Sequence, residues 1–108
     1  MQFILDNKTK ENIANILRQA GYFLLKKNPG ELSFIKSLTR NRFPRFHLYL
    51  KEKTDNQFSA NLHLDQKASI YNKQTAHSGE YEKDNPLLLT ESARIKQFFN
   101  ASDQPTNY

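Results

Sequence analysis

The stretch from Arg45 to Asp65, RFHLYLKEKTDNQFSANLHLD, constrains the fold more than any other part of the chain. Its two halves alternate between apolar and polar residues, as the strands of a half-buried antiparallel pair do. The apolar set comprises Phe46, Leu48, Leu50, Phe58, Ala60, Leu62 and Leu64. A polar turn at 54–56 separates the halves and sets the register of a hairpin. We therefore predict two paired strands with one buried face and one open face.

The predicted register brings polar residues of the two strands face to face. With Asp55 at the centre of the turn, the opposing pairs are Arg45 with Asp65, His47 with His63, and Tyr49 with Asn61. Acid, base and ligand chemistry would then meet on the open face of the sheet. The candidate catalytic residues are His47, His63, Tyr49 and Asp65.

The remaining pattern predicts two helices and a second hairpin. Apolar spacing favours a helix over 8–20 that stops at Gly21 and is capped by Asp6, Asn7 or Thr9. Strands are expected at 22–27 and 31–38, joined by the turn Asn28-Pro29-Gly30. A final helix begins either at Asn85, with proline in its first turn, or at Thr90.

These elements predict an α+β fold. A four-stranded antiparallel sheet, with 68–71 as a candidate short fifth strand, would carry the N-terminal and C-terminal helices on one face. Neighbouring strands are expected to pair in meander order. Residues 1–100 would form a single domain, because two cores would each be too small to be stable. Residues 101–108 are expected to be a flexible tail.

The composition excludes several classes of function. The chain has no cysteine, which rules out disulfides, thiolate zinc clusters and a cysteine nucleophile. A reducing compartment is compatible with this, so we expect a cytoplasmic protein. No stretch approaches the ~20 apolar residues of a membrane helix, so no membrane partner is expected. Glycine-rich phosphate loops are also absent, which argues against a nucleotide-dependent enzyme.

Charge points to an anionic partner. The formal net charge is +5, and basic residues concentrate before the hairpin turn while the later half is more acidic. Basic and aromatic residues interleave in this part of the chain, as phosphate contacts and base stacking require. The candidate binding residues are Arg40, Arg42, Arg45, Lys51 and Asn61. The first functional hypothesis is a small basic protein that binds RNA or another polyanion through its open sheet face.

Two other functions remain open at this stage. The first is a small hydrolase or nuclease, with His47 and His63 as a metal-free acid and base. If these two residues converge with His77, the three imidazoles would instead suit zinc or another divalent metal. The alternative to either site is that His47 and His63 form a cross-strand pair with no chemical role. The second is a protein-interaction adaptor that uses the open face or an edge strand.

Overall fold

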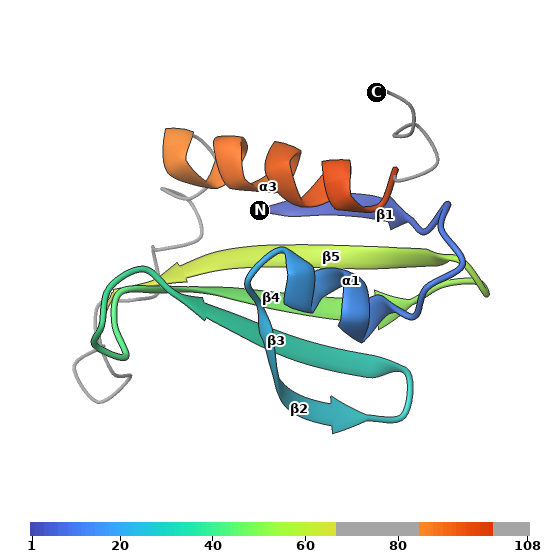
Figure 1. Cartoon of the computed structure of the whole chain (residues 1–108), viewed down its shortest axis with the longest axis horizontal. Coiled ribbons are helices and arrows are strands. Elements are labelled where there is room, and N and C mark those ends of the chain that lie inside the picture. The colour runs from blue at the N-terminus through green and yellow to red at the C-terminus, as the bar shows by residue number, and fades with distance from the viewer. Residues whose placement is uncertain (67–84, 101–108) are drawn as a thin grey trace.

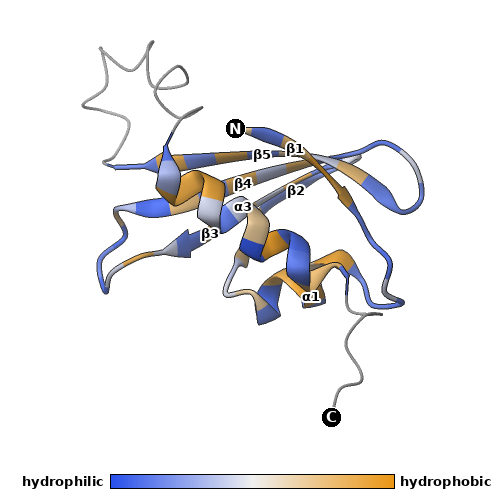
Figure 2. Cartoon of the chain, turned by 90° about the horizontal axis from the view of Figure 1, so that it is seen from above, coloured by the Kyte–Doolittle hydropathy of each residue, from blue (hydrophilic) through white to orange (hydrophobic). Residues whose placement is uncertain are grey.

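The structure, a computed structural model, describes residues 1–66 and 85–100 and has an α+β fold (Figure 1). Two helices cover one face of a five-stranded antiparallel sheet (Figure 2). The elements in chain order are β1 (Gln2–Asp6), α1 (Ile13–Gln19), β2 (Phe23–Asn28), β3 (Glu31–Ser37), β4 (Arg45–Glu52), β5 (Gln57–Asp65) and α3 (Pro86–Phe98). The predicted fold class and antiparallel sheet are confirmed.

The described sheet has one strand more than the four predicted, and it precedes the first helix. The strand order is β1-β5-β4-β3-β2, so β1 lies at an edge beside the last strand of the meander. In this strand Phe3 pairs with Ala60 and Leu5 pairs with Phe58. The strand has five residues, and its partner lies more than fifty positions away, so no local hairpin signal identifies it. The candidate strand at 68–71 and the tail at 101–108 lie outside the described residues.

Strands β2 to β5 pair in the predicted meander order. The turn between β2 and β3 is the expected Asn28-Pro29-Gly30, and Gly30 has a φ of +77°. Glycine suits this position because it has no Cβ to clash in the left-handed region. The second hairpin of the prediction is therefore confirmed together with its turn.

Helix α1 begins later than predicted. Asn12 caps it, since its Oδ1 accepts from the backbone N of Asn15 at 2.8 Å. The predicted cap positions were wrong, because Asn7 stabilises a preceding turn and accepts from the backbone N of Thr9 at 3.0 Å. The predicted stop was correct, since Gly21 follows the helix with a φ of +99°.

Helix α3 begins at the first of the two predicted positions. The side chain of Asn85 accepts from the backbone N of Leu87 at 2.8 Å, and Pro86 opens the helix. Proline fits here because its missing N–H would have no partner in the first turn. Among the described residues, neither helix is long and apolar enough to cross a membrane.

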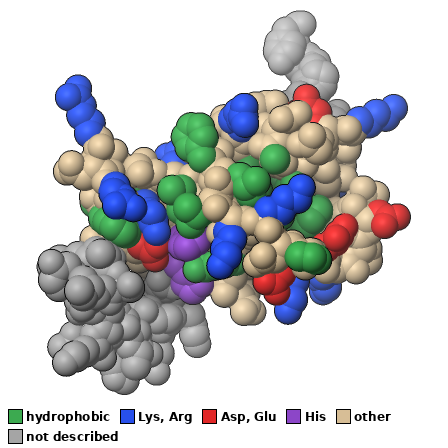
Figure 3. All heavy atoms as spheres, turned by 90° about the horizontal axis from the view of Figure 1, so that it is seen from below, with side chains coloured by type: hydrophobic (Ala, Val, Ile, Leu, Met, Phe, Trp, Pro, Cys, Tyr) green, Lys and Arg blue, Asp and Glu red, His purple; other side chains and the backbone are tan. Residues whose placement is uncertain are grey.

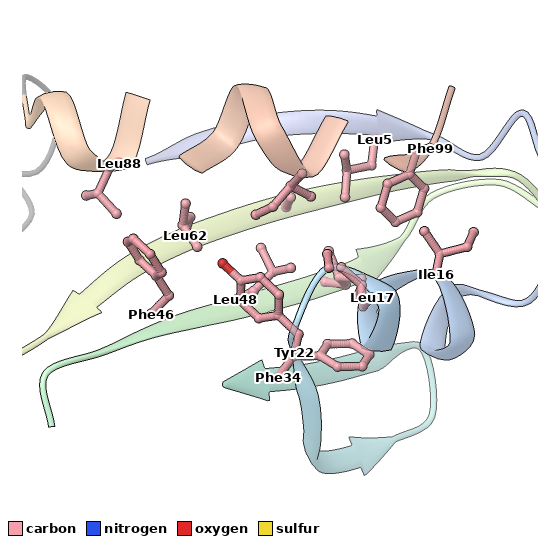
Figure 4. Packing of buried hydrophobic residues seen from close by; sticks show 14 residues of the cluster. Leu5, Ile16, Leu17, Tyr22, Phe34, Phe46, Leu48, Leu62, Leu88 and Phe99 are labelled. Atoms are coloured by element: carbon pink, nitrogen blue, oxygen red, sulfur yellow. The ribbon is translucent and has the colours of Figure 1, made fainter. Parts of the chain in front are cut away.

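The core lies between the helices and the apolar face of the sheet (Figure 4). Its buried members are Leu5, Ile16, Leu17, Ala20, Tyr22, Phe34, Phe46, Leu48, Leu50, Ala60, Leu62, Leu88, Ile95 and Phe99. Alternation along β4 and β5 turns Arg45, His47, Tyr49 and Lys51, and Ser59, Asn61, His63 and Asp65, to the opposite side. We call this second side the open face. It carries most of the predicted site.

A polar triad of buried Tyr22, buried Glu91 and partly exposed Arg94 joins α3 to the end of α1. The Tyr22 hydroxyl donates to Oε2 of Glu91 at 2.7 Å, and Arg94 donates to both oxygens of this carboxylate at 2.9 Å. Arg94 also donates to the backbone O of Ala20 at 2.6 Å. Burial raises the pKa of Glu91, but hydrogen bonds from Arg94 and Tyr22 outweigh it, so the pKa lies below its ordinary value. The Glu91 carboxyl is therefore ionised in the folded chain and faces the positive charge of Arg94.

Candidate functional site

The register of β4 and β5 is the predicted one. Arg45 lies opposite Asp65, His47 opposite His63, and Tyr49 opposite Asn61. The apolar register agrees as well, since Leu48 faces Leu62 in the core. A slip of one residue would have moved every polar side chain into the core, so the hydrophobic pattern specifies the pairing strongly. The structure thus brings the predicted cluster together on the open face.

His47 is the buried member of this cluster, with only 8 % of its surface exposed. Its Nδ1 lies 3.1 Å from Oδ2 of Asp65, and the Tyr49 hydroxyl lies 3.4 Å from the same nitrogen. When the imidazole is neutral and Nδ1 donates to the carboxylate, Nε2 carries the lone pair. This Nε2 atom is buried and makes no hydrogen bond in the part of the chain that the structure describes.

Tyr49 is the exposed member, with 45 % of its surface accessible on a central strand. Its ring stacks on the ring of His47 with centroids 4.2 Å apart and planes 23° apart. The ring of His63 contacts it edge-on at 5.6 Å. Burial raises the pKa of Tyr49, and the charge of Asp65 raises it further, so the phenol stays protonated. Tyr49 is therefore suited to stacking and hydrogen bonding rather than to acting as a base.

Arg45 is already engaged within the cluster. Its Nε donates to Oδ2 of Asp65 at 3.3 Å, and its guanidinium lies 4.6 Å from the ring centroid of Phe43. The side chain of Arg45 is only 16 % exposed. Arg45, which the sequence suggested as a phosphate contact, thus forms a cross-strand ion pair with Asp65 and is less available to a ligand.

Asp65 anchors both His47 and Arg45. The hydrogen bond from His47 lowers the pKa of Asp65; burial opposes this shift, and the hydrogen bond from Arg45 supports it. The net pKa lies below the ordinary value of 3.8. Asp65 is consequently ionised at neutral pH and holds the buried imidazole in place.

This shift predicts a pH dependence of stability. The folded-state pKa of Asp65 is below the unfolded one. Its contribution to the free energy of unfolding is therefore fully present above the unfolded pKa and is lost as the pH falls through the folded-state pKa. We expect Asp65→Asn to lower the free energy of unfolding by about 1 kcal/mol at neutral pH. Denaturant titrations of both proteins from about pH 7 to pH 2 should show this difference shrinking. If the difference in unfolding free energy between the two proteins did not change with pH, the ionised carboxylate of Asp65 would not be the source of the stabilisation.

A hollow of about 400 Å³ adjoins Tyr49 on the open face and has lining residues from all five strands. Its polar lining includes the amides Gln2, Asn28 and Asn61 and the hydroxyl groups of Ser33, Ser59 and Tyr49. Lys26, Lys51 and Glu31 supply charge around it, and Nζ of Lys51 lies 3.9 Å from Oε2 of Glu31. The hollow therefore combines hydrogen-bonding groups, an aromatic ring and ammonium groups.

The basic residues are less concentrated on the strands than the sequence suggests. On the open face, Lys26, Arg45 and Lys51 are balanced by Asp6, Glu31 and Asp65. Arg40 and Arg42 are exposed in the loop between β3 and β4, which leads directly into Arg45. Arg40 and Arg42 thus carry exposed positive charge in this loop, while Lys26 and Lys51 lie beside the hollow.

The predicted metal site is not assembled by the residues that the structure describes. His77 lies outside them, and within residues 1–66 and 85–100 no group of three or more His, Cys, Asp or Glu side chains could hold a metal ion. The carboxylate of Asp65 contacts His47 itself. Among the described residues, His47 and His63 therefore have no third side chain that would complete a metal site with them.

Sequence reasoning missed the triad of Tyr22, Glu91 and Arg94. The only local signal is the spacing of Glu91 and Arg94, which places them on one side of a helix turn. Tyr22 lies 69 positions from Glu91, so no sequence pattern could pair them. The hollow was missed for the same reason, since five separate strands line it.

Comparison of the chain with protein-family models, with curated proteins and with solved structures finds no match. The geometry of the open face is therefore the basis for a proposed function.

Proposed function

We propose that this protein binds single-stranded RNA across the open face of its sheet. The observation that carries the proposal is the half-exposed ring of Tyr49, which lies on a central strand beside a hollow lined with amides and ammonium groups. Unstacked bases of single strands bind to exposed aromatic rings of this kind, because every base has a flat π-face.

The Tyr49 ring is held in position before any ligand arrives. His47 stacks beneath it, and Asp65 fixes His47 through Nδ1. A ring held in this way loses little conformational freedom on binding, which favours affinity. In this proposal His47 and Asp65 are positioning residues, and Tyr49 is the residue that touches the ligand.

Polar groups around the ring would complete the site. Asn61 lies opposite Tyr49 and lines the same hollow, so its amide can hydrogen-bond to a base edge. Lys51 and Lys26 lie where phosphates of a strand crossing the hollow would pass. Arg40 and Arg42 would extend the track along the loop before β4, and Arg45 would contribute less because Asp65 engages it. Affinity should therefore depend on salt.

One contact favours a metal-free hydrolase as the second candidate. The carboxylate of Asp65 holds the imidazole of His47 as an orienting group holds a general base. However, the Nε2 atom, which would have to reach the substrate, is buried. Geometry therefore supports binding more strongly than catalysis.

A salt titration with a labelled single-stranded RNA of about 12 nucleotides tests the proposal. We expect affinity to fall linearly on a log–log plot, and Tyr49→Ala to weaken binding by about 1–3 kcal/mol without changing the slope. Lys51→Ala should make the slope shallower by about 0.7, because one phosphate contact is lost.

Two matched variants separate stacking from general effects. Tyr49→Phe keeps the ring and should keep most of the affinity, while Lys10→Ala removes an exposed cation before α1 and should leave the slope unchanged. Undetectable binding, an affinity independent of salt, or wild-type binding by Tyr49→Ala would each exclude this function.

A further inference from the structure

Strand β2 is an edge strand that no described element covers on its outer side. It forms one end of the sheet order β1-β5-β4-β3-β2, and all six of its residues are exposed. Helices α1 and α3 lie over the other strands, and β2 projects beyond them (Figure 1). Its outer backbone groups are therefore open to another chain.

The apolar content of this strand is unusual for an exposed edge. Phe23 is 63 % exposed, Leu24 is 47 % exposed and Leu25 is 49 % exposed. Phe23 pairs with Ile35 and so belongs to the open face, whereas Leu24 pairs with Phe34 and belongs to the helix side. Apolar surface is consequently offered on both sides of the same strand. Clustered exposed apolar residues of this kind mark interaction sites.

Two lysines follow directly in the same strand. Lys26 pairs with Ser33 on the open face, and Lys27 pairs with Leu32 on the helix side. Seen from the β2 side of the molecule, hydrophobic side chains gather with Lys and Arg side chains among them (Figure 3). Each side of the edge thus combines an apolar residue with an ammonium group.

We propose that the outer edge of β2 binds an extended acidic segment of another protein, which adds to the sheet as a further strand. Main-chain hydrogen bonds would supply affinity, as in other cases of strand addition. Apolar side chains of the segment would cover Phe23 and Leu24, and its carboxylates would meet Lys26 and Lys27. This interaction shares Lys26 with the proposed RNA site, because Lys26 also lines the hollow, whereas Leu24 and Lys27 lie on the helix side of the sheet.

Charge selects this partner over a second copy of the chain. In an antiparallel pairing of two copies centred on this strand, Leu25 would face Lys26 and Leu24 would face Lys27. Four ammonium groups would then crowd into a short ladder, and like charges close together across strands are destabilising. A register shift at Leu25, between Leu24 and Lys26, further disturbs a regular self-pairing. Lysines on an edge therefore oppose self-association but favour an acidic strand.

Two synthetic peptides of about ten residues test the inference, one alternating valine with glutamate and the other alternating valine with lysine. Amide shifts of the isotope-labelled full chain are the readout. We expect the glutamate peptide to shift the amides of β2, and Lys27→Glu to weaken it at least about tenfold while allowing the lysine peptide to bind. Lys10→Glu, with an equal change of charge elsewhere, should leave the affinity unchanged.

Three outcomes would overturn the inference. The first is an absence of shifts in β2 with the glutamate peptide. The second is equal binding of both peptides by the wild-type chain, which would exclude selection by charge. The third is a dimer in sedimentation that Leu25→Lys dissociates, because it would assign this edge to a second copy of the chain. Tyr49→Ala should bind the glutamate peptide as the wild-type chain does, because the edge of β2 does not include the ring on which the RNA proposal depends.

Discussion

Replacing Glu91 with alanine is expected to lower the free energy of unfolding by about 3 kcal/mol. Glu91 is 6 % exposed, and its carboxylate accepts hydrogen bonds from Tyr22 and Arg94. Its loss leaves the buried hydroxyl of Tyr22 without its acceptor and the guanidinium of Arg94 without its counter-charge. Arg94 is partly exposed and can be hydrated, so the hydroxyl of Tyr22 carries much of the cost. Denaturant unfolding of the two proteins measures the difference.

Two further variants make this result specific to the triad. Tyr22→Phe removes only the hydroxyl and should cost about 1 kcal/mol, because Arg94 still satisfies the carboxylate. Glu52→Ala removes an exposed carboxylate and should change stability by less than about 0.5 kcal/mol. Equal effects of Glu91→Ala and Glu52→Ala would show that the triad does not stabilise the fold.

Replacing Phe34 with alanine is expected to destabilise the fold by about 3–5 kcal/mol. Phe34 is 1 % exposed and belongs to the core cluster shown in Figure 4. Truncation removes apolar area from the core and leaves a cavity that neighbouring residues fill only in part. The loss is a large share of the total stability of a domain of this size. Thermal or denaturant unfolding would measure it.

Phe23 provides a matched control in the adjacent strand. Phe23→Ala makes the same change to a ring that is 63 % exposed, so we expect a loss of less than about 1 kcal/mol. A large loss at Phe23 would mean that this ring stabilises the isolated chain. In that case its exposure would no longer point to a partner.

The hairpin that carries the candidate site was predictable down to its register. Alternation places Leu48 and Leu62 in the core, and the short turn pairs them, so that His47 faces His63. Two features act together here, namely a side-chain period of two and a short connection. Local patterns also located the turn at Gly30 and gave Asn85 as one of two candidate starts of α3, because backbone geometry at these positions favours particular residues.

The roles of the residues within the site were less predictable. The sequence placed Arg45 opposite Asp65 but also suggested it as a phosphate contact, whereas in the structure its guanidinium is engaged by Asp65 and lies beside Phe43. His47 appeared as a catalytic candidate, yet its Nε2 atom is buried beneath the open face. Burial and side-chain pairing depend on neighbours in three dimensions, which alternation along a strand does not specify.

The sequence by itself therefore determined the α+β class, the β2–β5 meander and the side of the sheet on which each hairpin residue lies. These properties follow from contacts between nearby residues and from the hydrophobic period. Only the tertiary structure decided that Glu91 reaches Tyr22 and that β1 joins β5, which leaves β2 rather than β5 at an edge of the sheet. Each of these depends on segments far apart in the chain, whose contacts form only when the whole core assembles.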